Sequence, residues 1–284
     1  MIQSLKTIKN RIRSIENTKK VTAAMEMVSV AKLNRIEKSL FLLRPYVLGL
    51  KELMQNLINS QPEITHALLE AGPLTDKIAL CLITSDSGLC GTYNNNILRL
   101  AEEFINTHGR EKIKLVCIGR KGWNYFKQRG LEVLNTYIGL NGRYSAETLN
   151  EISANLVNIF TSREVAQVYV AYTCFKTALL QKPLIEKFLN LERPAQEERE
   201  YILEPDSQTI LNEIIPKYIS MKLRLIILES FTAEHSARIV AMKTATDNAK
   251  ELLEDLILFR NKVRQANITQ ELMEIISSSE ALRG

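Results

Sequence analysis

The stretch KYISMKLRLIILESFTAEHSARIVAMKTATDNAKELLEDLILFRNKVRQANITQELMEIISSSEALR, residues 217–283, contains neither glycine nor proline, the two residues that most often interrupt regular structure. Small residues recur in it at every fourth position, namely Ala237, Ala241, Ala245 and Ala249. This spacing would let a second helix approach closely. At ~1.5 Å per residue the stretch predicts a helix of roughly 100 Å, several times longer than the usual helix of about 11 residues.

A second stretch without glycine or proline covers residues 1–44. Its apolar residues begin with the 3-4-3 spacing of a heptad seam, at Leu5, Ile8, Ile12 and Ile15. One compact core cannot stabilise helices of this length, so each needs a partner along its length. We therefore predict that the two ends of the chain pair as an antiparallel coiled coil, with the C-terminal tip extending beyond the pair. Pro216 is expected to start or kink the second helix.

Apart from Gly284, all glycines and prolines lie between Pro45 and Pro216, and this middle part alternates between two kinds of pattern. Apolar runs typical of strands cover residues 78–84, 113–119, 131–137, 165–175 and 183–191. Helix-like stretches cover residues 95–108, 120–129 and 147–160. Alternation with short turns predicts a mostly parallel α/β domain. The expected parts are an N-terminal coiled-coil helix over 1–60, a Rossmann-like α/β domain over 75–195 and a C-terminal coiled-coil helix over 206–284.

The loop SDSGLCGTYNNN, residues 85–96, follows the first predicted strand, where such domains usually bind a ligand. It lacks both the G-x-G-x-x-G pattern and the Gly-Lys-Ser/Thr of a phosphate-binding loop. Asp86 lies between two serines and is expected to organise a turn or a helix cap, and Cys90 is expected to be a packing residue. With no carboxylate pair, nucleophile–base pair or metal-ligand spacing, the sequence predicts no catalytic residue, no cofactor and no metal.

Composition agrees with a folded, non-membrane chain of modest charge. Its 284 residues carry a net charge of +5, far below the charge density of a dedicated nucleic-acid binder. No apolar run approaches the ~20 residues of a membrane span. The four cysteines form no C-x-x-C pair and are predicted to be free thiols.

Four strings resemble, in order, the signature regions of the gamma subunits of F-type ATP synthases. They are ENTKKVTAAMEMVSVAKL (16–33), ITSDSGLCGTYNNNILR (83–99), HSARIVAMKTATDNAKEL (235–252) and RNKVRQANITQELMEIISSSEAL (260–282). One string could match by chance, whereas four in order along nearly the whole chain are highly specific. The family's fold, a long antiparallel coiled coil with a Rossmann-like domain, agrees with the pattern derived above from the residues.

The resemblance implies a non-catalytic central rotor. Its rotation would couple proton translocation through the membrane c-ring to ATP synthesis or hydrolysis in a head of three alpha and three beta subunits. The further implied partner is the epsilon subunit, and ATP and Mg²⁺ would bind to the head. The implied location is peripheral, on the cytoplasmic side of a bacterial inner membrane, without membrane insertion or nucleic-acid binding.

The resemblance also implies two sets of contact residues. The head contacts are Lys19, Lys20, Met25, Arg264, Gln265, Thr269 and Glu271. The foot contacts to the epsilon subunit or c-ring are Asp86, Gly88, Tyr93, Glu204 and Asp206. Periodicity alone would instead assign the cations to a solvated face of the coil.

Several positions depart from the family pattern. Ala23 stands where the family often has lysine, Thr92 replaces the second of two glycines, and Arg260 replaces an aromatic residue. The tip carries Glu280, which is expected to face a gap or a cation because a carboxylate near an apolar bearing prefers water. The cysteine insertion of the plant plastid type is missing from the sequence, so thiol control of rotation is not expected.

Three alternative functions remain to be weighed. A tethering coiled coil would explain the helical ends but not the ordered motifs. A nucleotide-dependent enzyme would use the α/β domain and would bind ATP or NAD tightly. Nucleic-acid binding by the basic N-terminal helix is disfavoured because Glu16, Glu26 and Glu37 interrupt its positive charge.

Overall fold

The computed structural model describes residues 5–60, 65–70, 75–177, 180–192 and 206–281. The chain divides into two compact units, residues 1–28 with 239–284, and residues 29–238. Helix α1 (Leu5–Ser60) and helix α5 (Ser207–Ala281) each contribute to both units. The predicted combination of long terminal helices with a central α/β domain is confirmed.

The larger unit, residues 29–238, contains a five-stranded sheet in the order β3-β2-β1-β4-β5. Its strands are β1 (Ile78–Ile83), β2 (Ile113–Ile118), β3 (Val133–Tyr137), β4 (Gln167–Phe175) and β5 (Gln181–Leu189). The first four strands are parallel, and β5 pairs antiparallel with β4 at one edge. The predicted mostly parallel sheet is therefore confirmed.

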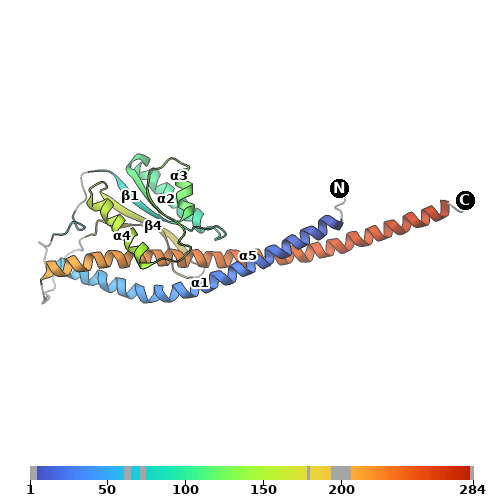
Figure 1. The fold of residues 1–284 in the computed structure, drawn as a ribbon, viewed down its shortest axis with the longest axis horizontal. Coiled ribbons are helices and arrows are strands. Elements are labelled where there is room, and N and C mark those ends of the chain that lie inside the picture. The colour runs from blue at the N-terminus through green and yellow to red at the C-terminus, as the bar shows by residue number, and fades with distance from the viewer. Residues whose placement is uncertain (1–4, 61–64, 71–74, 178–179, 193–205, 282–284) are drawn as a thin grey trace. The chain divides into compact units, whose positions relative to one another are not determined.

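Alternating side chains of β1 point to opposite faces of the sheet, as the period of two in a strand requires. Leu80 and Leu82 join one apolar cluster with helices α2 (Tyr93–His108) and α3 (Arg120–Lys127). Cys81 and Ile83 join a second cluster with helix α4 (Ala146–Thr161) and with parts of α1 and α5. The sheet is thus covered on both faces, which explains its continuous apolar strands (Figure 1).

The long helices pass through their prolines, and this corrects one prediction. Helix α5 begins at Ser207, so Pro216 lies inside the helix and does not start it. Asp206 caps this end, because its carboxylate accepts hydrogen bonds from the backbone N–H of Thr209 at 2.9 Å and from the Thr209 hydroxyl at 2.6 Å. These bonds, led by the hydroxyl, lower the pKa of Asp206. Helix α1 likewise continues through Pro45.

In the larger unit, α1 and α5 pack against each other and against the sheet in one core. Leu40 and Val47 of α1 belong to the same buried cluster as Ile215 and Leu223 of α5. Packing on several sides supports both helices here, which explains why the two prolines are tolerated.

The smaller unit, residues 1–28 with 239–284, contains only helical pairing among its described residues. Ile8 and Ile12 of α1 form an apolar cluster with Leu253 and Leu256 of α5. Thr22 contacts Thr246. Residue numbers therefore rise along α1 as they fall along α5, which confirms the predicted antiparallel pairing.

Candidate functional site

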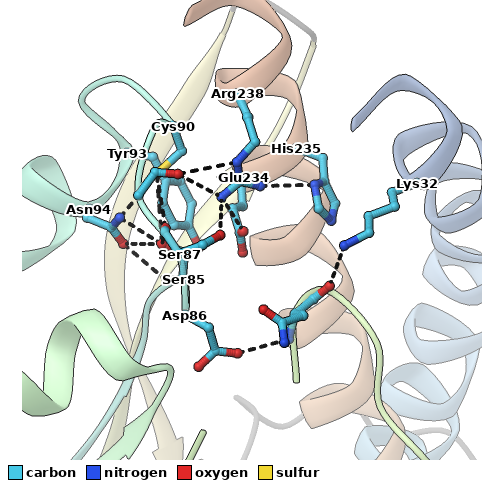
Figure 2. Close-up of polar contacts among 12 residues, drawn as sticks. Lys32, Ser85, Asp86, Ser87, Cys90, Tyr93, Asn94, Glu234, His235 and Arg238 are labelled. Carbon is cyan, nitrogen blue, oxygen red and sulfur yellow. Dashed lines mark hydrogen bonds and ion pairs between the residues drawn. The ribbon is translucent and has the colours of Figure 1, made fainter. Parts of the chain in front are cut away.

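The candidate site lies at the carboxyl ends of the parallel strands, between β1 and β4. In open α/β sheets a ligand usually binds in this crevice, where the strand order reverses. Here helix α5 contacts the loop that follows β1. Tyr93, at the start of α2, shares a hydrogen bond of 2.8 Å with Ser230 of α5, and Arg238 contacts Ser87 in the loop (Figure 2). The chain's own helix thus bonds to the loop at which a ligand would usually bind.

The loop from Ser85 to Asn94 is held by bonds of its own. The Asn94 side-chain carbonyl accepts from the Ser85 backbone N–H at 3.1 Å, and its amide nitrogen donates to the Ser85 hydroxyl at 2.7 Å and to the Cys90 sulfur at 3.1 Å. The Ser85 hydroxyl also donates to the carbonyl of Ser87 at 2.6 Å. Burial raises the pKa of the Cys90 thiol, so this cysteine is a packing residue and not an activated nucleophile.

A buried ion pair on α5 anchors this loop. Arg238 and Glu234 lie one turn apart and pair at 2.8 Å, with side chains only 6% and 3% exposed. The same guanidinium donates to the Ser87 hydroxyl at 3.1 Å and to the Gly88 carbonyl at 3.4 Å (Figure 2). Because Arg238 holds its donors in a fixed planar fork, these contacts fix the direction of the loop as well as its distance from α5.

His235 completes the cluster as a neutral base. Its Nδ1 lies 3.2 Å from the Arg238 guanidinium and accepts a hydrogen bond from it, which places the proton on Nε2. Nε2 has no partner among the described residues, and a Cβ atom at Gly142 would clash with it, so only glycine fits beside the ring. Burial, with the charges of Arg238 and Lys32, lowers the pKa of His235 to about 4. Burial also raises the pKa of Glu234, although Arg238 opposes that shift.

Asp86 joins three loops at the same edge of the sheet. Its carboxylate accepts backbone N–H bonds from Arg120, at the start of α3, and from Gly139 and Asn141, which follow β3, at 2.9–3.1 Å. Lys32 of α1 donates to the carbonyl of Asn141 at 3.0 Å (Figure 2). Asp86 therefore acts as the loop and helix-cap element predicted from the sequence.

A second ion pair connects α1, the sheet and α5. Arg44 of α1 pairs with Glu229 of α5 at 2.9 Å, and its guanidinium also donates to the carbonyl of Phe175 at the end of β4. The segments that follow β1 and β4 are therefore each held by an arginine whose ion-pair partner lies on α5. In the described part of the chain, no group of three His, Cys, Asp or Glu side chains could hold a metal ion.

Comparison with known sequences identifies the family of this arrangement. The family model described as ATP synthase matches residues 4–282. Relatives called ATP synthase gamma chain include one from Geotalea uraniireducens (strain Rf4), 39% identical over 287 residues, and one from Desulfitobacterium hafniense (strain DSM 10664 / DCB-2), 36% identical over 280 residues. These matches cover 99% and 98% of this chain, and 99% of each relative. The chain belongs to the ATP synthase gamma chain family.

Solved structures share the fold of this gamma-family chain. A chain of the Euglena gracilis mitochondrial ATP synthase, OSCP/F1/c-ring, matches with a TM-score of 0.68 and 17% identity, covering 98% of this chain and 94% of that chain. A chain of the Tetrahymena thermophila mitochondrial ATP synthase, central stalk/c-ring, matches with a TM-score of 0.63 and 21% identity, covering 79% and 99%. At these identities the comparison establishes the fold. Among the described residues, no helix is long and apolar enough to cross a membrane.

The residues predicted to contact the head lie in the smaller unit. Lys20, Arg264, Gln265, Thr269 and Glu271 are exposed, whereas Lys19 and Met25 are half-buried. All seven are placed on helices α1 and α5, where a partner could reach the exposed ones.

The residues predicted for the foot divide into four groups. Asp86 and Gly88 are half-buried, Asp206 is exposed, and Glu204 lies outside the described residues. Tyr93 requires a correction, because its side chain is 3% exposed and its hydroxyl bonds to Ser230 inside this chain. Leu89, which the sequence prediction missed, is 60% exposed. Its φ of 61° lies in the left-handed region, which is uncommon for a non-glycine residue.

The sequence analysis also did not predict the polar cluster of Glu234, His235 and Arg238. The pair Glu234–Arg238 has the i, i+4 spacing of an ordinary surface pair, so its spacing gives no sign of burial. A usable signal was the run of eleven residues, 226–236, in which apolar and polar side chains are mixed without a solvent-facing period. All eleven are buried in the structure.

The low pKa of His235 predicts a specific dependence of stability on pH. In the unfolded chain the histidine has its ordinary pKa of about 6.5, and in the folded chain the pKa is about 4. The folded state therefore binds fewer protons, so the contribution is fully present above pH 6.5 and is lost as pH falls through this window. Between pH 6.5 and 4, the free energy of unfolding should fall by up to about 1.4 kcal/mol per pH unit because of this group.

Urea unfolding of the chain and of a His235→Asn variant, measured at several pH values, tests this dependence. In the variant, the free energy of unfolding should no longer fall with pH because of His235, and it should keep only the pH dependence that comes from carboxylates. Parallel pH profiles for the two proteins would show that the pKa of His235 is the same in the folded and the unfolded chain.

Proposed function

We propose that this chain is the central-stalk gamma subunit of an F-type ATP synthase, a rotor that is not itself catalytic. It couples ion flow through a membrane c-ring to ATP synthesis or hydrolysis in a head of three alpha and three beta subunits. The observation that carries the proposal is membership of the gamma chain family over residues 4–282, combined with long antiparallel helices at the chain ends.

The contacts of the larger unit suit torque transmission. A domain that only packs on a helix through apolar contacts can slip, because the hydrophobic effect has no direction. Arg238 and Arg44 add hydrogen bonds of fixed direction that involve α1 and α5, and Asp86 joins the loops to one another. These bonds would make the α/β domain and its helices turn as one body. The loop at which a nucleotide would bind is also bonded to α5, which disfavours the enzyme alternative.

Seven residues on α1 and α5, five of them exposed and two half-buried, are the proposed contacts to the head. These are Lys19, Lys20, Met25, Arg264, Gln265, Thr269 and Glu271. The side chains of α5 from Arg264 to Thr269 are exposed except for half-buried Asn267, so a surrounding ring of subunits would bury polar and apolar groups together. Acidic or polar loops of the beta subunits are the proposed counterparts of Arg264.

Removing two of these contacts should lower turnover without unfolding the chain. The double variant Arg264→Ala, Gln265→Ala truncates two exposed side chains, so we expect the stability of the isolated chain to change by at most about 0.5 kcal/mol. ATP hydrolysis by the assembled head should fall at least about tenfold, corresponding to a loss of 1.4 kcal/mol in a step that needs these contacts. The matched control replaces exposed Glu213 and Lys217 of α5 by alanine and should hydrolyse ATP normally. Equal turnover in both variants would remove Arg264 and Gln265 from the proposed interface.

At the foot, Asp86, Gly88, Glu204 and Asp206 remain proposed contacts to the epsilon subunit or c-ring, and Leu89 takes the place of Tyr93. Leu89 suits this task because the bonds of Ser87 and Gly88 to Arg238 tie down the loop on one side of it, while its apolar side chain faces solvent. The chain would then be a peripheral membrane component, on the cytoplasmic side of a bacterial inner membrane.

Reconstitution tests the function directly. The chain mixed with alpha and beta subunits should yield a complex with one copy of this chain for three alpha and three beta subunits, and the complex should hydrolyse ATP. Mass measurement of the complex and an ATPase assay provide the two readouts. A chain that pairs only with itself, and confers no activity, would favour the tethering alternative.

A further inference from the structure

A pair of threonines interrupts the apolar contacts of the coil in the smaller unit. The hydroxyl oxygens of Thr22 on α1 and Thr246 on α5 lie 2.7 Å apart, and Thr22 is only 8% exposed. On the side toward the N-terminus of α1 lies the apolar cluster of Ile8 and Ile12 with Leu253 and Leu256. The pair is therefore a polar contact between the two helices, with the apolar cluster on one side of it.

Each hydroxyl also has an acceptor in its own helix. The Thr22 hydroxyl lies 3.0 Å from the carbonyl of Lys19, and the Thr246 hydroxyl lies 2.8 Å from the carbonyl of Met242. A threonine hydroxyl has one hydrogen to donate. The two hydrogens must therefore be shared among three possible bonds, and one of the three is always unmade.

Separation of the two helices at this pair would not reduce the number of hydrogen bonds that the two hydroxyls donate. With the helices together, one hydroxyl donates across the coil and the other donates to its own carbonyl. With the helices apart, both hydroxyls donate to their own carbonyls, so the number of donated bonds remains two. Separation therefore leaves no buried donor unsatisfied, which is the usual reason that breaking a buried hydrogen bond is expensive.

The apolar layers behave differently. Separating Ile8 or Ile12 from Leu253 or Leu256 exposes apolar surface to water, with a cost that rises with the exposed area. Separating Thr22 from Thr246 exposes two small side chains that are already partly polar. The resistance to sliding or twisting is therefore lower at this layer than in the apolar cluster beside it.

We propose that the Thr22–Thr246 layer is a yielding joint of the coil, at which the two helices separate or shift more easily than at the apolar cluster of Ile8, Ile12, Leu253 and Leu256. It differs from a polar layer that fixes register, in which separation leaves a buried group without a partner. The joint allows local twisting while the Ile8–Leu256 cluster holds the helices in register.

Hydrogen exchange on the full-length isolated chain tests the joint. The variants are Thr22→Val, Thr246→Val and the double variant, because valine has the same shape and lacks the hydroxyl. The matched control is Thr244→Val, since Thr244 is exposed and its hydroxyl makes the same kind of bond to the carbonyl of Val240 at 3.0 Å. The readout is the exchange rate of backbone amides in residues 19–26 and 243–250.

We expect the double variant to slow exchange in both segments at least about threefold, because the valine pair replaces the layer by apolar contact. The single variants should exchange no faster than the wild type, and Thr244→Val should leave the opposite segment, 19–26, unchanged. Faster exchange in either single variant would overturn the proposal, because it would show that the bond between the threonines holds the helices together. Unchanged exchange in the double variant would also overturn it. Because the chain is measured alone, the result does not depend on whether it turns inside a catalytic head.

Discussion

Replacement of Arg238 by methionine should destabilise the unit formed by residues 29–238 by about 3–5 kcal/mol, the usual cost of leaving a buried charge without its partner. Glu234 is 3% exposed, and Arg238 is its ion-pair partner at 2.8 Å. The variant also removes the donors to the Ser87 hydroxyl and the Gly88 carbonyl, so the loop after β1 loses its anchor on α5. Urea unfolding at neutral pH measures the loss of free energy.

The pH dependence of this variant adds a second check. Burial raises the pKa of Glu234 and Arg238 opposes the shift, so removal of Arg238 should raise the pKa further. The folded state then holds a proton that the unfolded state has released. Stability should therefore fall as pH rises from the ordinary glutamate pKa of about 4.3 toward the raised value, and the variant should lose less stability at pH 5 than at pH 8.

The double variant Glu234→Leu, Arg238→Met is the matched control. It removes both charges and fills the space with apolar groups, so it should be more stable than Arg238→Met alone. A favourable coupling in this double-mutant cycle would assign the effect to the pair. If Arg238→Met unfolds at the same urea concentration as the wild type, the cluster does not anchor the loop.

Replacement of Ala245 by proline should disrupt the coil locally and abolish coupled ATP synthesis in the assembled enzyme. Proline removes a backbone hydrogen bond and clashes with the preceding turn, at a cost of ~3 kcal/mol or more in a helix interior. The native prolines, Pro45 and Pro216, lie in the larger unit, where the sheet and both helices share one core. At Ala245 the described contacts of α5 within its unit come from α1 alone, so little else can support a distorted helix.

The measurement is ATP synthesis driven by an ion gradient, compared with ATP hydrolysis by the same preparation. Ala245→Ser is the control, because serine lowers helix propensity only slightly and keeps the backbone bond. Far-UV circular dichroism should show only a local loss of helix in the proline variant. Full coupling in Ala245→Pro would show that coupling does not need a continuous α5 helix at this position.

The fold was largely predictable because its main signals are local. The 3-4-3 spacing of Leu5, Ile8, Ile12 and Ile15 predicts a coiled-coil seam, and Ile8 and Ile12 are buried in the apolar cluster of the smaller unit. The apolar runs at 78–84 and 113–119 became β1 and β2 almost without change. The predicted bounds of the C-terminal helix, 206–284, lie close to those of α5, but Pro216 does not start the helix, because the packing of the larger unit supports the helix through Pro216, a tertiary effect that local propensity cannot anticipate.

The candidate site was much less predictable, because its parts are distant in sequence. The sequence by itself determined the paired helices, the parallel strands and the family, since hydrophobic periodicity and ordered motifs are properties of neighbouring residues. Only the tertiary structure decided that Tyr93 faces inward, that Leu89 faces outward, and that Arg238 closes on Ser87 from 151 positions away. Because it is buried, the i, i+4 ion pair of Glu234 and Arg238 anchors the loop. The pair is buried only because segments far apart in the chain pack together and exclude water there.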